Sequence, residues 1–225
     1  GRASELGWSK VVTLTGAALS GFDAGNYVLD SVATTTASIT SLHITGNFTA
    51  ADKVYDGSEA ATVLTRSLTG VLAGDAVELT GGTATFANKN VGVDKVVTLD
   101  NAALSGLDSG NYALDSVATT TASISILHVT GSFTAENKVY DGTNVAGVAS
   151  RTVVGAISGD AVALTGGIAT FADENIGVSK VVTLTGAALT GLDAGNYELD
   201  SVATTTASIT SLHITGNFTA ADKVY

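Results

Sequence analysis

The loops that carry acidic and amide side chains are the first place in this sequence where chemistry is expected. Three similar stretches, FDAGNY at 22–27, LDSGNY at 107–112 and LDAGNY at 192–197, place an Asp and an Asn on either side of a glycine. Such oxygens bind Ca²⁺, which takes six to eight ligands, so with Asp56 or Asp75 from a neighbouring turn these loops are calcium candidates. The candidate residues are Asp23, Asn26, Asp108, Asn111, Asp193 and Asn196. Because each loop has too few oxygens and lacks the alternating acids of an EF-hand, a hairpin turn is the favoured interpretation.

A second recurring motif, Tyr-Asp-Gly, follows Lys-Val at 55–57 and at 140–142. An Asp in this setting either binds a ligand or stabilises a turn. In a turn, Asp accepts hydrogen bonds from the local backbone, and Gly takes the positive φ that other residues avoid. The tyrosine ring would then pack on the core, with its hydroxyl donating to a backbone carbonyl. We therefore interpret the motif as a structural turn, formed by Tyr55, Asp56, Gly57, Tyr140, Asp141 and Gly142.

The histidines and serines do not form a catalytic pattern. His43, His128 and His213 recur once per copy, and neither a cysteine nor a second histidine accompanies them, which argues against zinc. No G-x-S-x-G motif is present, and a lone histidine with scattered serines is not a triad. We predict that the chain is not an enzyme and needs no cofactor, with Ca²⁺ as the alternative.

The lysines leave one covalent alternative open. An intramolecular Lys–Asn isopeptide bond requires a buried lysine, an asparagine and an acid in contact. The candidates are Lys53, Lys138 and Lys223, and Lys95 with Asn90 or Asn111. Surface lysines are the favoured interpretation, and intact mass tests it because each bond releases ammonia.

The composition limits the classes of partner. The 225 residues include no Cys, Met or Pro and carry a net charge of −11, so a phosphate backbone would repel the chain and nucleic acid is excluded as a partner. No apolar run is long enough to span a membrane. Glycine and β-branched residues are abundant whereas the helix formers of solvated faces are scarce, which predicts an all-β fold with many turns.

An internal repeat of 85 residues organises the chain. Lys10, Lys95 and Lys180 each precede VVTL at this spacing, which suits a small autonomous domain. The apolar positions change phase near Thr40–Ser41, so we place domain boundaries there and at the equivalent positions. This predicts a partial repeat at 1–40, complete domains at 42–125 and 127–210, and the first strand of a further repeat at 211–225. Residues 1–7 match the later copies poorly, as a vector-derived leader would.

A second division of the chain stays open. Segment 8–55 recurs as 93–140 and 178–225, with 56–92 and 141–177 between them, so the sequence also reads as X-Y-X-Y-X. In our preferred frame, linkers of one or two residues without glycine hold neighbouring domains stiffly.

Turn signals within the first complete domain divide it into short strands. Such punctuation predicts a Greek-key, Ig-like β-sandwich, with a β-solenoid or interlocked β repeats as the alternative. The predicted strands are 42–49, 60–68, 75–80, 83–87, 94–99, 101–105 and 111–124.

These residues resemble a known family. The motifs KVYDG, GDAVELTGGTATFANKNVG, KVVTL and SGLDSGNYALDS are similar to those of the YDG and MBG-type repeat domains, which occur in tandem in large bacterial surface proteins such as filamentous-haemagglutinin-like adhesins. The resemblance implies an Ig-like extracellular module, displayed on the bacterial cell surface, with no enzymatic activity.

We predict a structural role: a stalk segment that projects a distal binding region of an adhesin and whose partners are its neighbouring repeats. The alternative is that each repeat itself binds a glycan, a matrix protein or another copy of the adhesin. Between the complete repeats, 58–74 and 143–159 differ most, so a ligand role would be sought there first.

Overall fold

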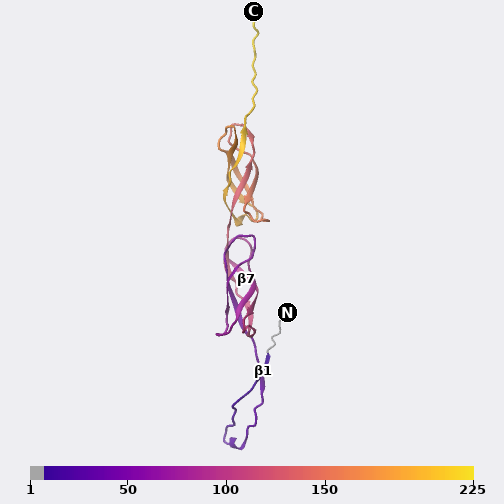
Figure 1. The fold of residues 1–225 in the computed structure, drawn as a ribbon, viewed down its shortest axis with the longest axis vertical. Helices are drawn as coiled ribbons and strands as arrows, with labels where there is room; N and C mark the ends of the chain where they lie inside the picture. Colours follow the sequence, from indigo (N-terminus) through magenta and orange to yellow (C-terminus); the bar gives the residue numbers. More distant parts are fainter. Residues whose placement is uncertain (1–7) are drawn as a thin grey trace. The chain divides into compact units, whose positions relative to one another are not determined.

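The computed structural model describes residues 8–225 of the chain (Figure 1). Over this range the regular structure consists of β-strands and three short 3₁₀ turns, η1 (Ala24–Asn26), η2 (Ser109–Asn111) and η3 (Ala194–Asn196). In this part of the chain, no helix is long and apolar enough to cross a membrane. The all-β prediction is confirmed. The leader predicted at 1–7 lies outside the described residues.

Each complete repeat contains seven strands in the same order. Those of the first are β3 (Leu42–Ala50), β4 (Lys53–Val54), β5 (Val63–Thr69), β6 (Glu78–Phe86), β7 (Gly92–Ser105), β8 (Tyr112–Val117) and β9 (Thr120–Ser125). Those of the second are β10 (Leu127–Ala135), β11 (Lys138–Val139), β12 (Val148–Val154), β13 (Ala163–Phe171), β14 (Gly177–Thr190), β15 (Tyr197–Val202) and β16 (Thr205–Thr210).

The strands of each repeat form two sheets, which confirms the predicted tandem β-sandwiches. In the second repeat, β12-β10-β15 make one sheet and β11-β16-β14-β13 the other, and the first repeat has the matching orders β5-β3-β8 and β4-β9-β7-β6. β10 pairs antiparallel with β12 and parallel with β15. The second repeat's strands run from coral pink through orange to yellow in Figure 1.

Alternation along the strands builds that core. Val182 and Leu184 of β14 point inward together with Ala207 and Ile209 of β16, while the intervening residues face outward. Gly131 of β10 lies where the two sheets approach closely, since a Cβ at this position would be 2.9 Å from Leu164 Cδ2. Burial of these apolar side chains is the main stabilising contribution to each sandwich.

The structure differs from several predicted strand boundaries, and three of these differences have a clear structural reason. Gly81 and Gly82, predicted as a turn, lie inside β6, where both have positive φ and interrupt the strand without ending it. The segments 94–99 and 101–105 form the single strand β7, in which Asn101 has a φ of 58°. The long final strand 111–124 is divided between β8 and β9, because the chain changes sheets after Val117.

The segments outside the complete repeats are exposed. β1 (Trp8–Val12) pairs only with β2 (Thr35–Ile39) among the described strands, and Val11 and Ile39 remain open to solvent. Residues 211–225 have the same sequence as 41–55 but form no strand. In the first repeat this sequence forms β3, which lies between β5 and β8.

Contacts divide the chain into two compact units whose borders cut through the first repeat. One unit holds residues up to 50, 63–84 and 98–120, and the other holds 51–62, 85–97 and 121–225. One end of the first repeat therefore belongs to the same compact unit as the whole second repeat. The candidate site lies in this unit.

Candidate functional site at the repeat junction

The Tyr-Asp-Gly motif forms a turn directly after β4. Asp56 Oδ1 accepts hydrogen bonds from Ser58 N and Ser58 Oγ, each at 2.9 Å, and from Lys53 Nζ at 2.8 Å. Gly57 takes a φ of 77°, which a side chain would strain. Burial would raise the pKa of Asp56, but the hydrogen bond from Lys53 and those from Ser58 lower it. The carboxylate is thus occupied in closing the turn.

The second motif repeats this geometry. Asp141 Oδ1 accepts hydrogen bonds from Thr143 N and Thr143 Oγ1, each at 2.9 Å, and from Lys138 Nζ at 2.7 Å. The Lys138 hydrogen bond is the main cause that lowers the pKa of Asp141 to about 2. The turn is therefore a property of each repeat alone.

The lysines named as isopeptide candidates hold these turns and loops. Lys53 Nζ donates to Asp56 and to the carbonyls of Ser58 and Ala60, and lies 5.5 Å from the centre of the Phe86 ring. Lys95 Nζ donates to Asn88 Oδ1 at 2.6 Å, whereas the sequence suggested Asn90 or Asn111. Lys223 lies in the exposed segment 211–225.

Tyr55 reaches beyond its own repeat, and its contact corrects the expectation for the tyrosine hydroxyl. The side chain is 2% exposed, and its hydroxyl donates to Asp160 Oδ2 of the second repeat at 2.6 Å, where a backbone carbonyl was expected. Tyr197 donates to the same carboxylate oxygen, also at 2.6 Å. The two tyrosine rings meet edge to face with their centres 5.4 Å apart. One carboxylate therefore joins tyrosines of both repeats.

Lys89 supplies the positive charge at this carboxylate. Its Nζ lies 2.8 Å from Asp160 Oδ1 and 3.0 Å from Asp193 Oδ1. Burial would raise the pKa of Asp160, but the hydrogen bonds from Lys89 and the two tyrosines lower it to about 2. The Asp160 and Asp193 hydrogen bonds raise the pKa of Lys89, and burial next to Asp160 raises the pKa of Tyr197 to about 12. Lys89 and Asp160 thus form an ion pair, and the neutral hydroxyls of Tyr55 and Tyr197 donate to the same carboxylate.

An amide contact completes the junction. Asn196 Oδ1 accepts the Val91 N–H at 2.9 Å, and Asn196 Nδ2 donates to Asn90 Oδ1 at 3.2 Å. Asn196 is 5% exposed, and both polar atoms of its side chain have a hydrogen-bond partner in the facing loop. We call the first repeat's contribution, Tyr55, Lys89, Asn90 and Val91, the lysine face. We call the second repeat's contribution, Asp160, Asp193, Asn196 and Tyr197, the aspartate face.

Three of the six predicted calcium residues, Asp108, Asp193 and Asn196, make hydrogen bonds within the protein. Asp108 Oδ2 accepts the Ala76 N–H and Asp193 Oδ2 accepts the Ala161 N–H, each at 2.8 Å. Asp23 precedes η1 without a side-chain cap, Asn26 and Asn111 are exposed, and Asn196 lies in the junction. In residues 8–225, no three or more His, Cys, Asp or Glu side chains are grouped to hold a metal ion.

The sequence did not single out Lys89 or Asp160 for the junction. Neither residue belongs to a motif with a chemical signature. A signal was present in the charge: position 89 is lysine and its counterpart 174 is glutamate.

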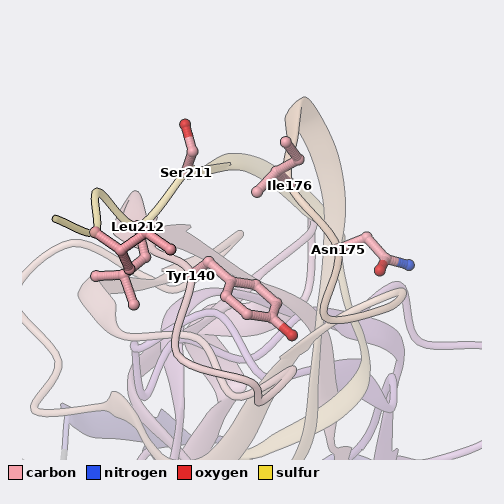
Figure 2. A pocket seen from close by; sticks show the side chains of 6 residues that line it. Tyr140, Asn175, Ile176, Ser211 and Leu212 are labelled. Atoms are coloured by element: carbon pink, nitrogen blue, oxygen red, sulfur yellow. The ribbon is translucent and has the colours of Figure 1, made fainter. Parts of the chain in front are cut away.

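The matching face of the second repeat is open. Tyr140, Asn175 and Ile176 line a hollow of about 420 Å³ with Ser211, Leu212 and Ile214 (Figure 2). Tyr140 is 38% exposed and Ile176 is 59% exposed. We call Tyr140, Glu174, Asn175 and Ile176 the glutamate face.

Comparison with known proteins identifies the repeat. The family model of the YDG domain matches residues 40–122 and again 126–208. No curated protein sequence and no solved structure matches the chain. The two matches together cover well over half of the sequence, and the chain therefore belongs to the YDG domain family.

Proposed function

We propose that the chain is a stalk segment of a bacterial cell-surface adhesin, exported from the cell, in which tandem YDG domains carry a distal binding region away from the surface. The observation that supports this best is the contact between the lysine face and the aspartate face. A stalk must hold each repeat at a fixed orientation to the next. A contact outside the covalent link restrains bending, whereas a free linker would not.

The covalent link is itself short. β9 ends at Ser125 and β10 begins at Leu127, so a single residue, Ile126, separates the strands. Beside it, Tyr55 and Lys89 contact Asp160. Two loops of the first repeat therefore contact the second repeat beside the covalent link. Several points of contact favour a stiff connection between the repeats over a flexible one.

Charge and dimensions fit the same role. The net charge of −11 favours separate chains over lateral association. A strand the length of β10, nine residues, spans about 30 Å. Adding repeats is therefore an economical way to lengthen the proposed stalk, and the proposal includes no enzymatic activity.

Small-angle scattering of the chain tests the proposal. A compact particle of 225 residues would have a radius of gyration of about 17 Å. A stalk predicts a value well above this, with a narrow distribution of lengths. Inserting four Gly-Ser pairs at Ile126 provides the matched control and should broaden the distribution. A radius of gyration near the compact value for the unaltered chain would contradict the stalk function.

One observation favours the alternative, a binding module. The most different segments, 58–74 and 143–159, include β5 and β12, which are edge strands of their three-stranded sheets. Variation on an exposed edge suits recognition of a glycan, a matrix protein or another copy of the chain. Exchange of 58–74 for 143–159 would change ligand binding under this alternative and leave scattering unchanged.

A further inference from the structure

The glutamate face retains most of the lysine face's contact groups but not its charge. Asn88, Lys89 and Val91 are replaced in the second repeat by Asp173, Glu174 and Ile176, while Tyr140 and Asn175 match Tyr55 and Asn90. The hydroxyl and the amide that take part in the observed junction are both present, and Ile176 stands in the place of Val91, whose N–H donates to Asn196. The main chemical difference is the reversal of charge at Glu174.

The glutamate face is more exposed to solvent than the lysine face. Tyr55 is 2% exposed in the docked junction, whereas its counterpart Tyr140 is 38% exposed. The neighbouring Ile176 is 59% exposed and borders the hollow in Figure 2. The side chains that a partner would cover are therefore in place and open.

The aspartate face does not suit this site. At the observed junction, Asp160 and Asp193 both lie within 3.0 Å of the Lys89 ammonium. Glu174 in the place of Lys89 would bring a third carboxylate against these two, and like charges at an interface reject a partner. The first repeat carries the same two acids, Asp75 and Asp108, so its equivalent face is rejected for the same reason.

We propose that the glutamate face docks a further YDG repeat that presents a basic residue at the position of Asp193. This inference rests on the proposed function, in which repeats dock end to end. The sequence 211–225 repeats residues 41–55, and its Ser211, Leu212 and Ile214 line the hollow beside the glutamate face. The residue at position 89 or 174 then determines which repeat can follow.

The position of the basic residue follows from the hydroxyl donors. Asp160 Oδ2 accepts hydrogen bonds from Tyr55 and Tyr197. Because Tyr140 is retained on the glutamate face, its partner still needs an acceptor equivalent to Asp160. Asp193 pairs with Lys89 and accepts one backbone N–H, and neither tyrosine hydroxyl donates to it. It is therefore the position at which a basic residue can replace the acid.

Amide exchange of Val91 in the full chain tests this rule, because the Val91 N–H donates to Asn196 across the junction. Lys89→Glu imitates the glutamate face and should accelerate Val91 exchange at least tenfold. Combining it with Asp193→Lys should restore slow exchange. In Asp193→Lys alone, Lys89 would face a second positive charge, and Val91 exchange should stay fast. Lys89→Gln is the neutral control and should lie between the unaltered chain and Lys89→Glu. Amides of β14 report whether each variant is folded.

Three outcomes would overturn the inference: unchanged Val91 exchange in Lys89→Glu, failure of Asp193→Lys to rescue it, or rescue of Lys89→Glu by added calcium alone. The last would mean that a cation joins two acidic faces. None of these outcomes depends on particle dimensions. A compact particle in scattering contradicts the stalk, whereas unchanged Val91 exchange contradicts only the charge rule.

Discussion

The docked lysine face and the open glutamate face carry the same Lys-Val-Tyr-Asp-Gly sequence in two settings. The turn is the same in both, since Asp56 and Asp141 accept equivalent hydrogen bonds. The tyrosines differ: Tyr55 is buried against Asp160, and Tyr140 lies at the edge of an open hollow. The motif thus always forms a turn but forms a contact only when a partner face is present.

The opposite faces of the two repeats give the complementary lesson. Tyr112 donates to Asp75 Oδ2 at 2.5 Å, just as Tyr197 donates to Asp160, although the first repeat's equivalent Asn111 is exposed. The hydrogen bond to Asp75, followed by burial, raises the pKa of Tyr112. The tyrosine–aspartate pair is therefore built within a single repeat, and docking adds further donors to a preorganised acceptor.

Truncation of the two motif tyrosines should separate the faces most strongly. Tyr55→Ala removes a buried ring and its hydrogen bond, so we expect a loss of about 3 kcal/mol in the free energy of unfolding. Tyr140→Ala, at an exposed ring, should cost less than about 1 kcal/mol. Denaturant unfolding followed by circular dichroism measures both. Equal losses would mean that the ring stabilises its own repeat and not the junction.

The Asp160 carboxylate gives the next largest effect and a pH dependence. Its pKa is about 2 in the folded chain, below the unfolded value of about 3.9. Its contribution is therefore present above about pH 4 and is lost as the pH falls through about 2. Asp160→Asn should cost about 2 kcal/mol at pH 7, because it removes a charged hydrogen-bond acceptor.

Comparison with Asp160→Asn isolates this carboxylate from others that also titrate at low pH, such as Asp141. The difference in stability between the unaltered chain and Asp160→Asn should shrink from pH 5 to pH 2. A difference that stays constant over this range would contradict the assignment.

The two motif glycines sharpen the comparison at smaller scale. Gly57 and Gly142 have φ values of 77° and 79°, so alanine at either position should cost about 1–2 kcal/mol through backbone strain. A Cβ at Gly57 would also lie 3.0 Å from Ile157 Cγ2, whereas nothing lies within 4 Å at Gly142.

The loss of stability in Gly57→Ala should therefore exceed the loss in Gly142→Ala by roughly 0.5 kcal/mol. Thermal unfolding of the two variants measures the excess directly. A larger loss of stability in Gly142→Ala would contradict the close contact between position 57 and Ile157.

The sequence predicted what depends on local pattern. The β-branched composition and the turn signals indicated strands, and Asp56–Gly57 indicated a turn. It did not predict that Gly81–Gly82 continue a strand, or that the chain changes sheets after Val117, because both depend on pairing with distant segments.

The junction was hidden for a related reason. Tyr55 and Asp160 are 105 residues apart, and neither residue type signals an interface alone. The prediction that short linkers would stiffen the array considered only the chain near Ser125. Lys89 and Asn196 lie far from Ser125 in the sequence, and only their placement in space reveals that they pair across the junction.

The smallest predicted effect concerns a pair of residues within one repeat that belong to neither compared face, and it provides a baseline for them. His128 Nδ1 lies 2.7 Å from Asp200 Oδ1, with both side chains about half exposed. The hydrogen bond to Asp200 raises the pKa of His128, so the pair stabilises the fold below the unfolded pKa of about 6.5 and is lost as the pH rises through the folded value. In NMR titrations, Asp200→Asn should lower the His128 pKa and leave Val91 exchange unchanged. A changed Val91 exchange rate would mean that the junction depends on surface charge throughout the repeat, and not on Lys89 and its two aspartates.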